Sequence, residues 1–238
     1  MKPFEGFGNV AYHVLRKSED ELLVSTEDAG PGIFNTRTKK FFFFGKDQIP
    51  DLQNSPTCSS KSLKTPDGFV FFSVCEGLIK FDPFSSYFRF QELPITKSQN
   101  NKSFRISRVL EDPGHQKIYF ALELGNGLNA LDTRTGILKD YPVEVKASRM
   151  EKLMIIHDML IDRNGRMWVL STDFLYEFDR KKQELKKLTR AWQRHPEKEQ
   201  EEFKNIVQST DGTLWILTHQ GGVYPFDPVS QTLGPRIN

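Results

Sequence analysis

Five polar residues stand at one position of a repeated pattern, and together they could bind a small molecule. They are His13, Lys61, Arg108, Asp158 and Asn205, here called the polar column. Three of them precede the glycine of a following turn by seven residues, and the other two match once less regular turns are aligned. Convergent polar groups in a concavity can hold a small ligand. The alternative is that these five residues bind nothing and are polar only because strand ends exposed to solvent are usually polar.

Catalytic chemistry has weaker support in this sequence. A propeller-fold lyase or a glycan-active enzyme would need an acid and a base at one site, and only His157 and Asp158 are candidates. Neighbouring residues of a regular strand point to opposite faces, which separates the two groups. The sequence has no Gly-rich phosphate loop and no Gly-x-Ser-x-Gly, and its five histidines lack metal-ligand spacing. We therefore expect no catalytic residue, no metal site and no cofactor.

The polar column belongs to a cassette that occurs five times. Its last copy, residues 211–227, reads as an Asp-Gly turn, an apolar strand with Leu-Trp-Ile, a Gly-Gly turn and a second strand that ends in Asp. The large residues of the first of these strands, here called the marker residues, are separated by 48, 48, 49 and 47 positions: Leu23, Phe71, Tyr119, Trp168 and Trp215. A fixed period of this size indicates a repeat architecture.

Each repeat can be divided into four short strands, and this predicts an all-β fold. We expect a β-propeller, or an open part of one, with about five four-stranded antiparallel blades around a channel. The polar column would stand at the start of each innermost strand and surround one mouth of that channel. The whole chain, residues 1–238, would form one propeller region, with blades at 9–45, 60–92, 104–142, 155–189 and 203–235. A β-sandwich is the rival fold, but it would not repeat one cassette five times. Blades buried on both faces also explain apolar runs that do not alternate.

The turns and the last strand give two further expectations. Each third strand ends in a residue that can bond the backbone two positions on, which favours a structural role: Asn35, Asp82, Asp132, Asp179 and Asp227. The outer strand of the last repeat, residues 231–235, looks stunted. Residues 2–8 could supply a missing outer strand there and close a ring.

Composition excludes several classes of partner. The chain has 33 basic and 31 acidic residues and a formal net charge of +2, which gives no general attraction to nucleic acid. No stretch approaches the ~20 apolar residues of a membrane span, and the start lacks the apolar run of a secretion signal. Cys58 and Cys75 could form a disulfide, but two free thiols are the preferred interpretation.

The cassette resembles the two-component regulator propeller repeat. Residues 206–227 carry the fullest match, with Asp-Gly, Leu-Trp-Ile-Leu-Thr and a closing Phe-Asp, and residues 159–179 come next. Such repeats are similar to those in the extracytoplasmic sensor regions of hybrid two-component histidine kinases. The resemblance implies propellers of seven blades that recognise ligands, often glycan fragments. Seven blades of this period would need about 336 residues, so it also implies that this is part of a sensor region.

The sequence thus favours a non-catalytic module for ligand sensing or interaction. Its partners would be a carbohydrate or another small molecule, or a protein partner such as a second copy. We expect no contact of this segment with a membrane, and a periplasmic location if it belongs to a longer sensor protein. Two alternatives stay open: a propeller-fold lyase or glycan-active enzyme, and a truncated structural fragment with no independent function.

Overall fold

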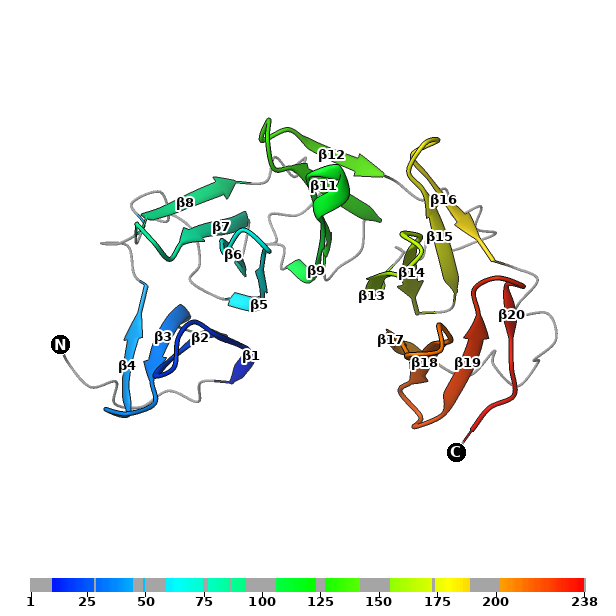
Figure 1. Ribbon diagram of the computed structural model, residues 1–238, viewed down its shortest axis with the longest axis horizontal. Helices are drawn as coiled ribbons and strands as arrows, with labels where there is room; N and C mark the ends of the chain where they lie inside the picture. Colours follow the sequence, from blue (N-terminus) through cyan, green and yellow to red (C-terminus); the bar gives the residue numbers. More distant parts are fainter. Residues whose placement is uncertain are drawn as a thin grey trace, which may run out of the picture. The chain divides into compact units, whose positions relative to one another are not determined.

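The computed structural model describes residues 10–27, 29–44, 49, 59–74, 77–85, 87–92, 106–122, 127–141, 155–172, 174–188 and 202–237. Within these ranges the regular structure consists of β-strands and one short 3-10 helix, η2 (Pro113–His115). The strands form five antiparallel sheets of four strands each (Figure 1). This confirms the predicted all-β fold of propeller type. Cys58, Cys75 and residues 2–8 lie outside the described ranges.

Each sheet, here called a blade, follows the order of the sequence from its first to its fourth strand. Blade 1 consists of β1 (Ala11–Arg16), β2 (Glu21–Thr26), β3 (Gly30–Asn35) and β4 (Lys40–Phe43). Blade 2 consists of β5 (Ser59–Lys64), β6 (Val70–Val74), β7 (Gly77–Asp82) and β8 (Tyr87–Glu92). Blade 3 consists of β9 (Ile106–Asp112), β10 (Lys117–Leu122), β11 (Leu128–Asp132) and β12 (Leu138–Tyr141).

The last two blades repeat this plan. Blade 4 consists of β13 (Ile156–Ile161), β14 (Met167–Ser171), β15 (Leu175–Asp179) and β16 (Glu184–Lys187). Blade 5 consists of β17 (Phe203–Gln208), β18 (Leu214–Thr218), β19 (Val223–Asp227) and β20 (Thr232–Leu233). The chain divides into two compact units, unit 1 with residues 1–123 and 131–138 and unit 2 with residues 124–130 and 139–238. That residues 1–238 form a single propeller region stays a prediction.

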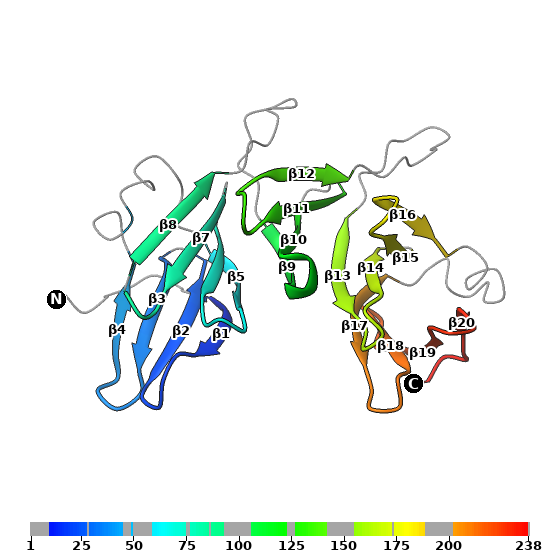
Figure 2. The same cartoon turned by 45° about the horizontal axis from the view of Figure 1, so that its top comes forward.

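In unit 1, blades 1 and 2 lie side by side and share a core (Figure 2). Phe44, which follows β4, packs edge-on against Phe72 with ring centroids 6.2 Å apart. Phe72 faces blade 1, whereas its neighbour Phe71 belongs to a second core together with Ile118 and Phe120 of blade 3. Because both faces of β6 are covered, all of its residues are buried, and apart from Ser73 they are apolar and do not alternate with polar ones.

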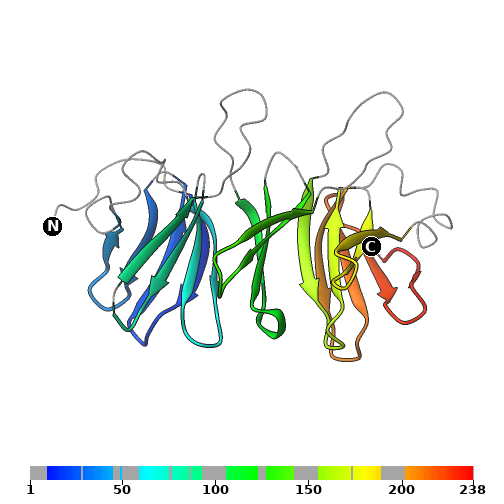
Figure 3. The same ribbon diagram turned by 90° about the horizontal axis from the view of Figure 1, so that it is seen from above.

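In unit 2, blades 4 and 5 pack face to face (Figure 3). Trp168 of β14 is fully buried and meets Phe226 of β19 in a T-shaped contact with ring centroids 5.5 Å apart. Leu214 and Ile216 of β18 line the same core. The marker residue of a blade therefore points towards the next blade, as Leu23 and Phe71 do in unit 1.

The turns after the third strands have the predicted structural role. Oδ1 of Asn35 accepts hydrogen bonds from the backbone N of Arg37 at 3.1 Å and of Thr38 at 2.8 Å. The aspartates at the equivalent positions bind their own turns in the same way: Asp82, Asp132, Asp179 and Asp227. Hydrogen bonds from the residue three positions on lower the pKa of all four carboxyl groups.

The last blade corrects one hypothesis. Its strand β20 is short, as expected, but the chain then continues along β19. Gly234 N donates to Pro225 O at 2.7 Å, and Ile237 pairs with Val223 through two backbone hydrogen bonds of 2.9 Å. The outer edge of β19 is thus occupied by residues 232–237, so the premise that the last blade lacks an outer strand is wrong. Residues 2–8 themselves lie outside the described residues.

Candidate functional site

A β-bulge interrupts the first strand of every blade. In blade 4, Ile156 pairs with Ser171 and Asp158 pairs with Leu170, so that His157 is an extra residue. The register shifts at the equivalent place in the other four blades. The polar column stands at these bulges. In four blades its residue comes one position after the extra residue, and in blade 2 Lys61 lies within the irregular stretch between Ser59 and Ser62. Bulges often lie beside functional sites, because they change the direction of a side chain.

The sequence analysis missed the bulges, although their trace is present. Buried residues on one face of a regular strand lie an even number of positions apart. In β13 and β17 the buried residues lie three apart: Ile156 and Met159, and Phe203 and Ile206. An odd spacing of this kind requires one extra residue, so it could have indicated the bulge beforehand.

In unit 1, the bulges place members of the polar column on neighbouring strands. Strand β1 lies beside β5, and β5 lies beside β9. Nδ1 of His13 lies 2.7 Å from Oγ of Ser62, which is the residue after Lys61. Partial burial of the His13 imidazole lowers its pKa, and the positive charge of Lys61 lowers it further. His13 thus contacts the residue that follows Lys61 in β5.

Backbone contacts hold Lys61 and Arg108 in this region. The Ser73 hydroxyl accepts a hydrogen bond from Lys61 N at 2.8 Å and donates one to Lys61 O at 3.1 Å. Arg108 Nη1 donates to the carbonyl of the bulge residue Ser107 at 2.8 Å. Both side chains are partly exposed. Unit 1 thus presents two cationic groups and one imidazole at the same end of its first strands.

In unit 2, Asp158 and Asn205 are brought together. Oδ2 of Asp158 accepts hydrogen bonds from Ile206 N at 3.0 Å and from Asn205 Nδ2 at 3.3 Å. As with His13 and Ser62, the column residue of one blade reaches the residue just after the column residue of the next. The column therefore links neighbouring blades in both units. That all five residues surround one channel mouth stays a prediction.

Among the residues that the structure describes in unit 1, two buried hydroxyl groups have no hydrogen-bond partner. Oγ of Ser25 and Oγ of Ser59 are both inaccessible to solvent. Ser25 lies opposite His13 in the β1–β2 ladder, and Ser59 begins β5 two residues before Lys61. Strands β2 and β5 are in contact. Buried hydroxyls are normally hydrogen-bonded, so this end of blades 1 and 2 has unused capacity for a water molecule or a ligand.

The bulge also changes the argument about His157 and Asp158. Strict alternation of faces does not apply across a bulge, so the assumption that the two side chains point apart has no basis. Nε2 of His157 lies 3.1 Å from Oγ1 of Thr172, whereas Oδ2 of Asp158 reaches Ile206 in the next blade. The two side chains thus have different partners.

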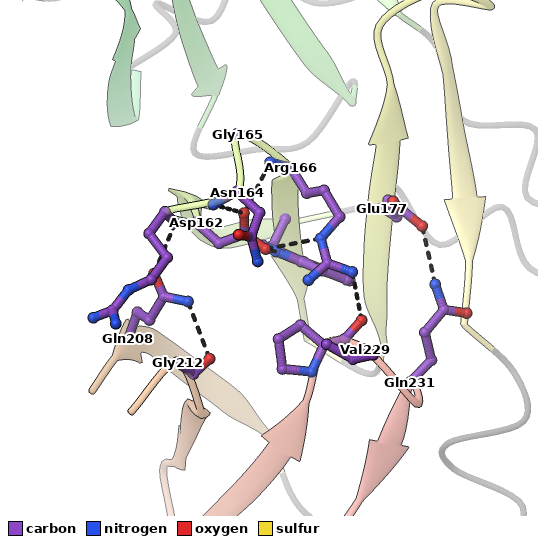
Figure 4. Close-up of polar contacts among 12 residues, drawn as sticks. Asp162, Asn164, Gly165, Arg166, Glu177, Gln208, Gly212, Val229 and Gln231 are labelled. Carbon is purple, nitrogen blue, oxygen red and sulfur yellow. Dashed lines mark hydrogen bonds and ion pairs between the residues drawn. The ribbon is translucent and has the colours of Figure 1, made fainter. Parts of the chain in front are cut away.

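A second polar cluster, which the sequence analysis did not single out, lies at the turn between β13 and β14 (Figure 4). The buried carboxylate of Asp162 accepts hydrogen bonds from the backbone N of Asn164 and of Arg166 at 2.9 Å. Its other oxygen accepts from Arg166 Nε at 3.0 Å and from Trp168 Nε1 at 2.9 Å. Arg166 Nη1 continues to the carbonyl oxygen of Pro228 in blade 5, at 2.5 Å.

Arg163 adds to this connection between blades 4 and 5. Its backbone N donates to Gln208 Oε1 at 2.9 Å, and its guanidinium donates to the carbonyl oxygens of Ser209 at 2.9 Å and Thr210 at 2.5 Å. Farther out, Gln231 Nε2 donates to Glu177 Oε2 at 3.1 Å. Because every long-range contact of this cluster joins one blade to the next, its role is structural.

Comparison with known proteins identifies relatives of the fold. No family model and no curated protein matches the chain. Solved structures do: the extracellular domain of the hybrid two-component system BT3049 from B. thetaiotaomicron has a TM-score of 0.68 at 14% identity, over 96% of this chain and 28% of that one. The corresponding domain of BT4673 from the same organism gives 0.67 at 17%, over 97% and 30%.

A third similar structure is PorZ, a surface component of the type-IX secretion system of Porphyromonas gingivalis. Its TM-score is 0.71 at 14% identity, over 98% of this chain and 35% of that one. This chain thus spans about a third of the length of these proteins or less. At such identities the likeness shows the fold alone, and the sensor-region repeat stays a resemblance. Among the described residues there is no helix long and apolar enough to cross a membrane.

Proposed function

We propose that this protein is a non-catalytic ligand-sensing module whose polar-column residues in unit 1, His13, Lys61 and Arg108, bind a small polar ligand. The observation that carries the proposal is the bulge that recurs beside the column in all five blades. The similar extracellular domains of two-component systems support a sensing role and a periplasmic or extracellular location. A carbohydrate fits the chemistry, since polar side chains with two unused hydroxyls suit a hydroxyl-rich ligand.

The charges in unit 1 narrow the ligand class. Lys61 and Arg108 are cationic, and the lowered pKa of His13 keeps its imidazole neutral at pH 7. A carboxylate would accept charge-assisted hydrogen bonds from both cations, and these are stronger than bonds between neutral groups. We therefore expect an acidic oligosaccharide, one that contains uronic acid, to bind better than its neutral counterpart.

Isothermal titration calorimetry with paired neutral and uronate oligosaccharides tests this function. Lys61→Gln and Arg108→Gln should each weaken binding of the acidic ligand about tenfold, which corresponds to roughly 1.4 kcal/mol. Lys64→Gln is the matched control, because Lys64 is an exposed lysine at the other end of β5. Equal affinities of all three variants, or no binding by any oligosaccharide, would contradict the proposal.

The absence of catalysis is part of the proposal and needs its own measurement. The same oligosaccharides should be incubated with the purified protein and separated by chromatography. We expect no cleavage products. Turnover that disappears in His157→Ala would assign an enzyme instead, with His157 in its site.

A further inference from the structure

The contact between successive blades follows one rule within each unit. The forward face of a blade packs on the backward face of the next, where forward means towards the C-terminus. Leu15 and Leu23 of blade 1 pack on the core with Phe72 of blade 2. In unit 2, Leu160 and Trp168 of blade 4 pack in the same way on Phe226 and its neighbours in blade 5. Each blade thus has two apolar faces with distinct roles.

The forward face of blade 5 is apolar but partly open to solvent. Its residues lie directly opposite one another in the ladder, with Val207 beside Trp215 and Trp215 beside Pro225. Val207 is 50% exposed and Ile237, at the edge, is 49% exposed. At the position equivalent to Trp215, Trp168 is fully buried by the next blade.

The backward face of blade 1 is exposed in a similar way. Val14 lies opposite Val24 in the β1–β2 ladder and is 50% exposed, and Tyr12 is 41% exposed. At the position equivalent to Val14, Ile206 of blade 5 is only 3% exposed, because blade 4 covers it. The chain thus carries both halves of the contact between blades, and each half has exposed apolar side chains.

We propose that a second copy of this chain docks here, with the forward face of blade 5 on the backward face of blade 1. The occupant follows from continuity with the existing contacts, because a backward face of the same repeat already receives a forward face in both units. The polar contact would also repeat. Asp158 of blade 4 binds Ile206 N, so Asn205 of one copy would face Val14 N of the other. This inference rests on the fold and is independent of the proposed ligand.

Such a contact is heterologous, since two different surfaces meet, and this makes a sharp experiment possible. Analytical ultracentrifugation of the full chain should show dimers or larger species. Val14→Lys and Val207→Lys each spoil one half of the contact, so each variant alone should be monomeric. In an equimolar mixture one intact half from each variant can still combine, so the mixture should form a heterodimer and stop there.

Controls separate this result from misfolding and from other occupants. Both valines are half-exposed, so the lysine variants should keep the circular dichroism spectrum of the parent. Val229→Lys, at an 80% exposed valine in the turn before β20, should associate like the parent. A monomeric parent would overturn the proposal and assign the faces to another partner. If the parent is monomeric and Val207→Lys has a lower melting temperature than the parent, the two faces contact each other within one chain. This result would also overturn the proposal.

Discussion

Nε1 of Trp168 donates a hydrogen bond to Oδ2 of Asp162 across 2.9 Å, and both side chains are fully buried. The contact ties the marker residue of β14 to the turn that precedes it. The same carboxylate orders that turn through two backbone amides. One buried charge therefore holds the local turn, the core tryptophan and, through Arg166, the next blade.

Asp162→Asn should lower the free energy of unfolding by about 2–3 kcal/mol. The amide oxygen can still accept from the backbone, but the amide nitrogen would face the donors of Trp168 and Arg166, and a buried donor left unpaired is costly. Urea denaturation followed by tryptophan fluorescence measures the change. Asp211→Asn is the control, because Asp211 is exposed and its amide could still accept from Thr213 N. Equal stability of Asp162→Asn and the parent would contradict the structural role.

Asp158 should stabilise the contact between β13 and β17. Asp158→Ala leaves Ile206 N without this acceptor, and Ile206 is buried. We expect a loss of about 1–3 kcal/mol, the usual cost of an unsatisfied buried donor. Asp158→Asn keeps an acceptor oxygen and should recover most of that loss. If thermal unfolding shows that Ala and Asn are equally destabilising, the carboxylate oxygen is not what matters to Ile206.

Gly212 is required by the turn between β17 and β18. Its φ is +97°, and a Cβ would meet nothing within 4 Å, so the cost of Gly212→Ala would come from the backbone alone. We expect about 1–2 kcal/mol of destabilisation, the usual penalty for a side chain in the left-handed region. Gly114→Ala, where a Cβ would make an ordinary 3.7 Å contact, should be tolerated. Equal melting temperatures of the two variants would exclude backbone strain.

His13 should make stability depend on pH. Burial keeps the folded-state pKa of its imidazole below the ordinary value of 6.5, so the unfolded chain binds the proton more readily. The stability that comes from the neutral imidazole is fully present above the ordinary pKa of 6.5. It is lost as the pH falls from there through the folded-state pKa. His13→Asn should reduce the loss of stability between about pH 7 and pH 5. Identical profiles of parent and His13→Asn would contradict this.

Much of the fold could be predicted because its information is local. The third strands end at Asn35, Asp82, Asp132, Asp179 and Asp227, as the turn chemistry indicated. An aspartate at the start of a turn bonds residues two and three positions away, so spacing alone reveals it. The position of the polar column, seven residues before a turn glycine in three repeats, could also be read from spacing.

The partners of the column could not be read from the sequence. His13 and Ser62 are 49 positions apart, and Asp158 and Ile206 are 48 apart. Whether such residues meet depends on how one blade stacks on the next. The pairing of the last strand could not be read from the sequence either. Only the structure showed that residues 234–237 run along β19 and pair with its outer edge.

The sequence by itself determined the period of about 48 residues, the four strands of each repeat and the turns between them, because these depend on side-chain type and short-range spacing. Only the tertiary structure decided which way each side chain points. A bulge of one residue in the first strand reverses the alternation of faces, and so it settles that Asp158 reaches the next blade and that Val207 lies half-exposed on a forward face.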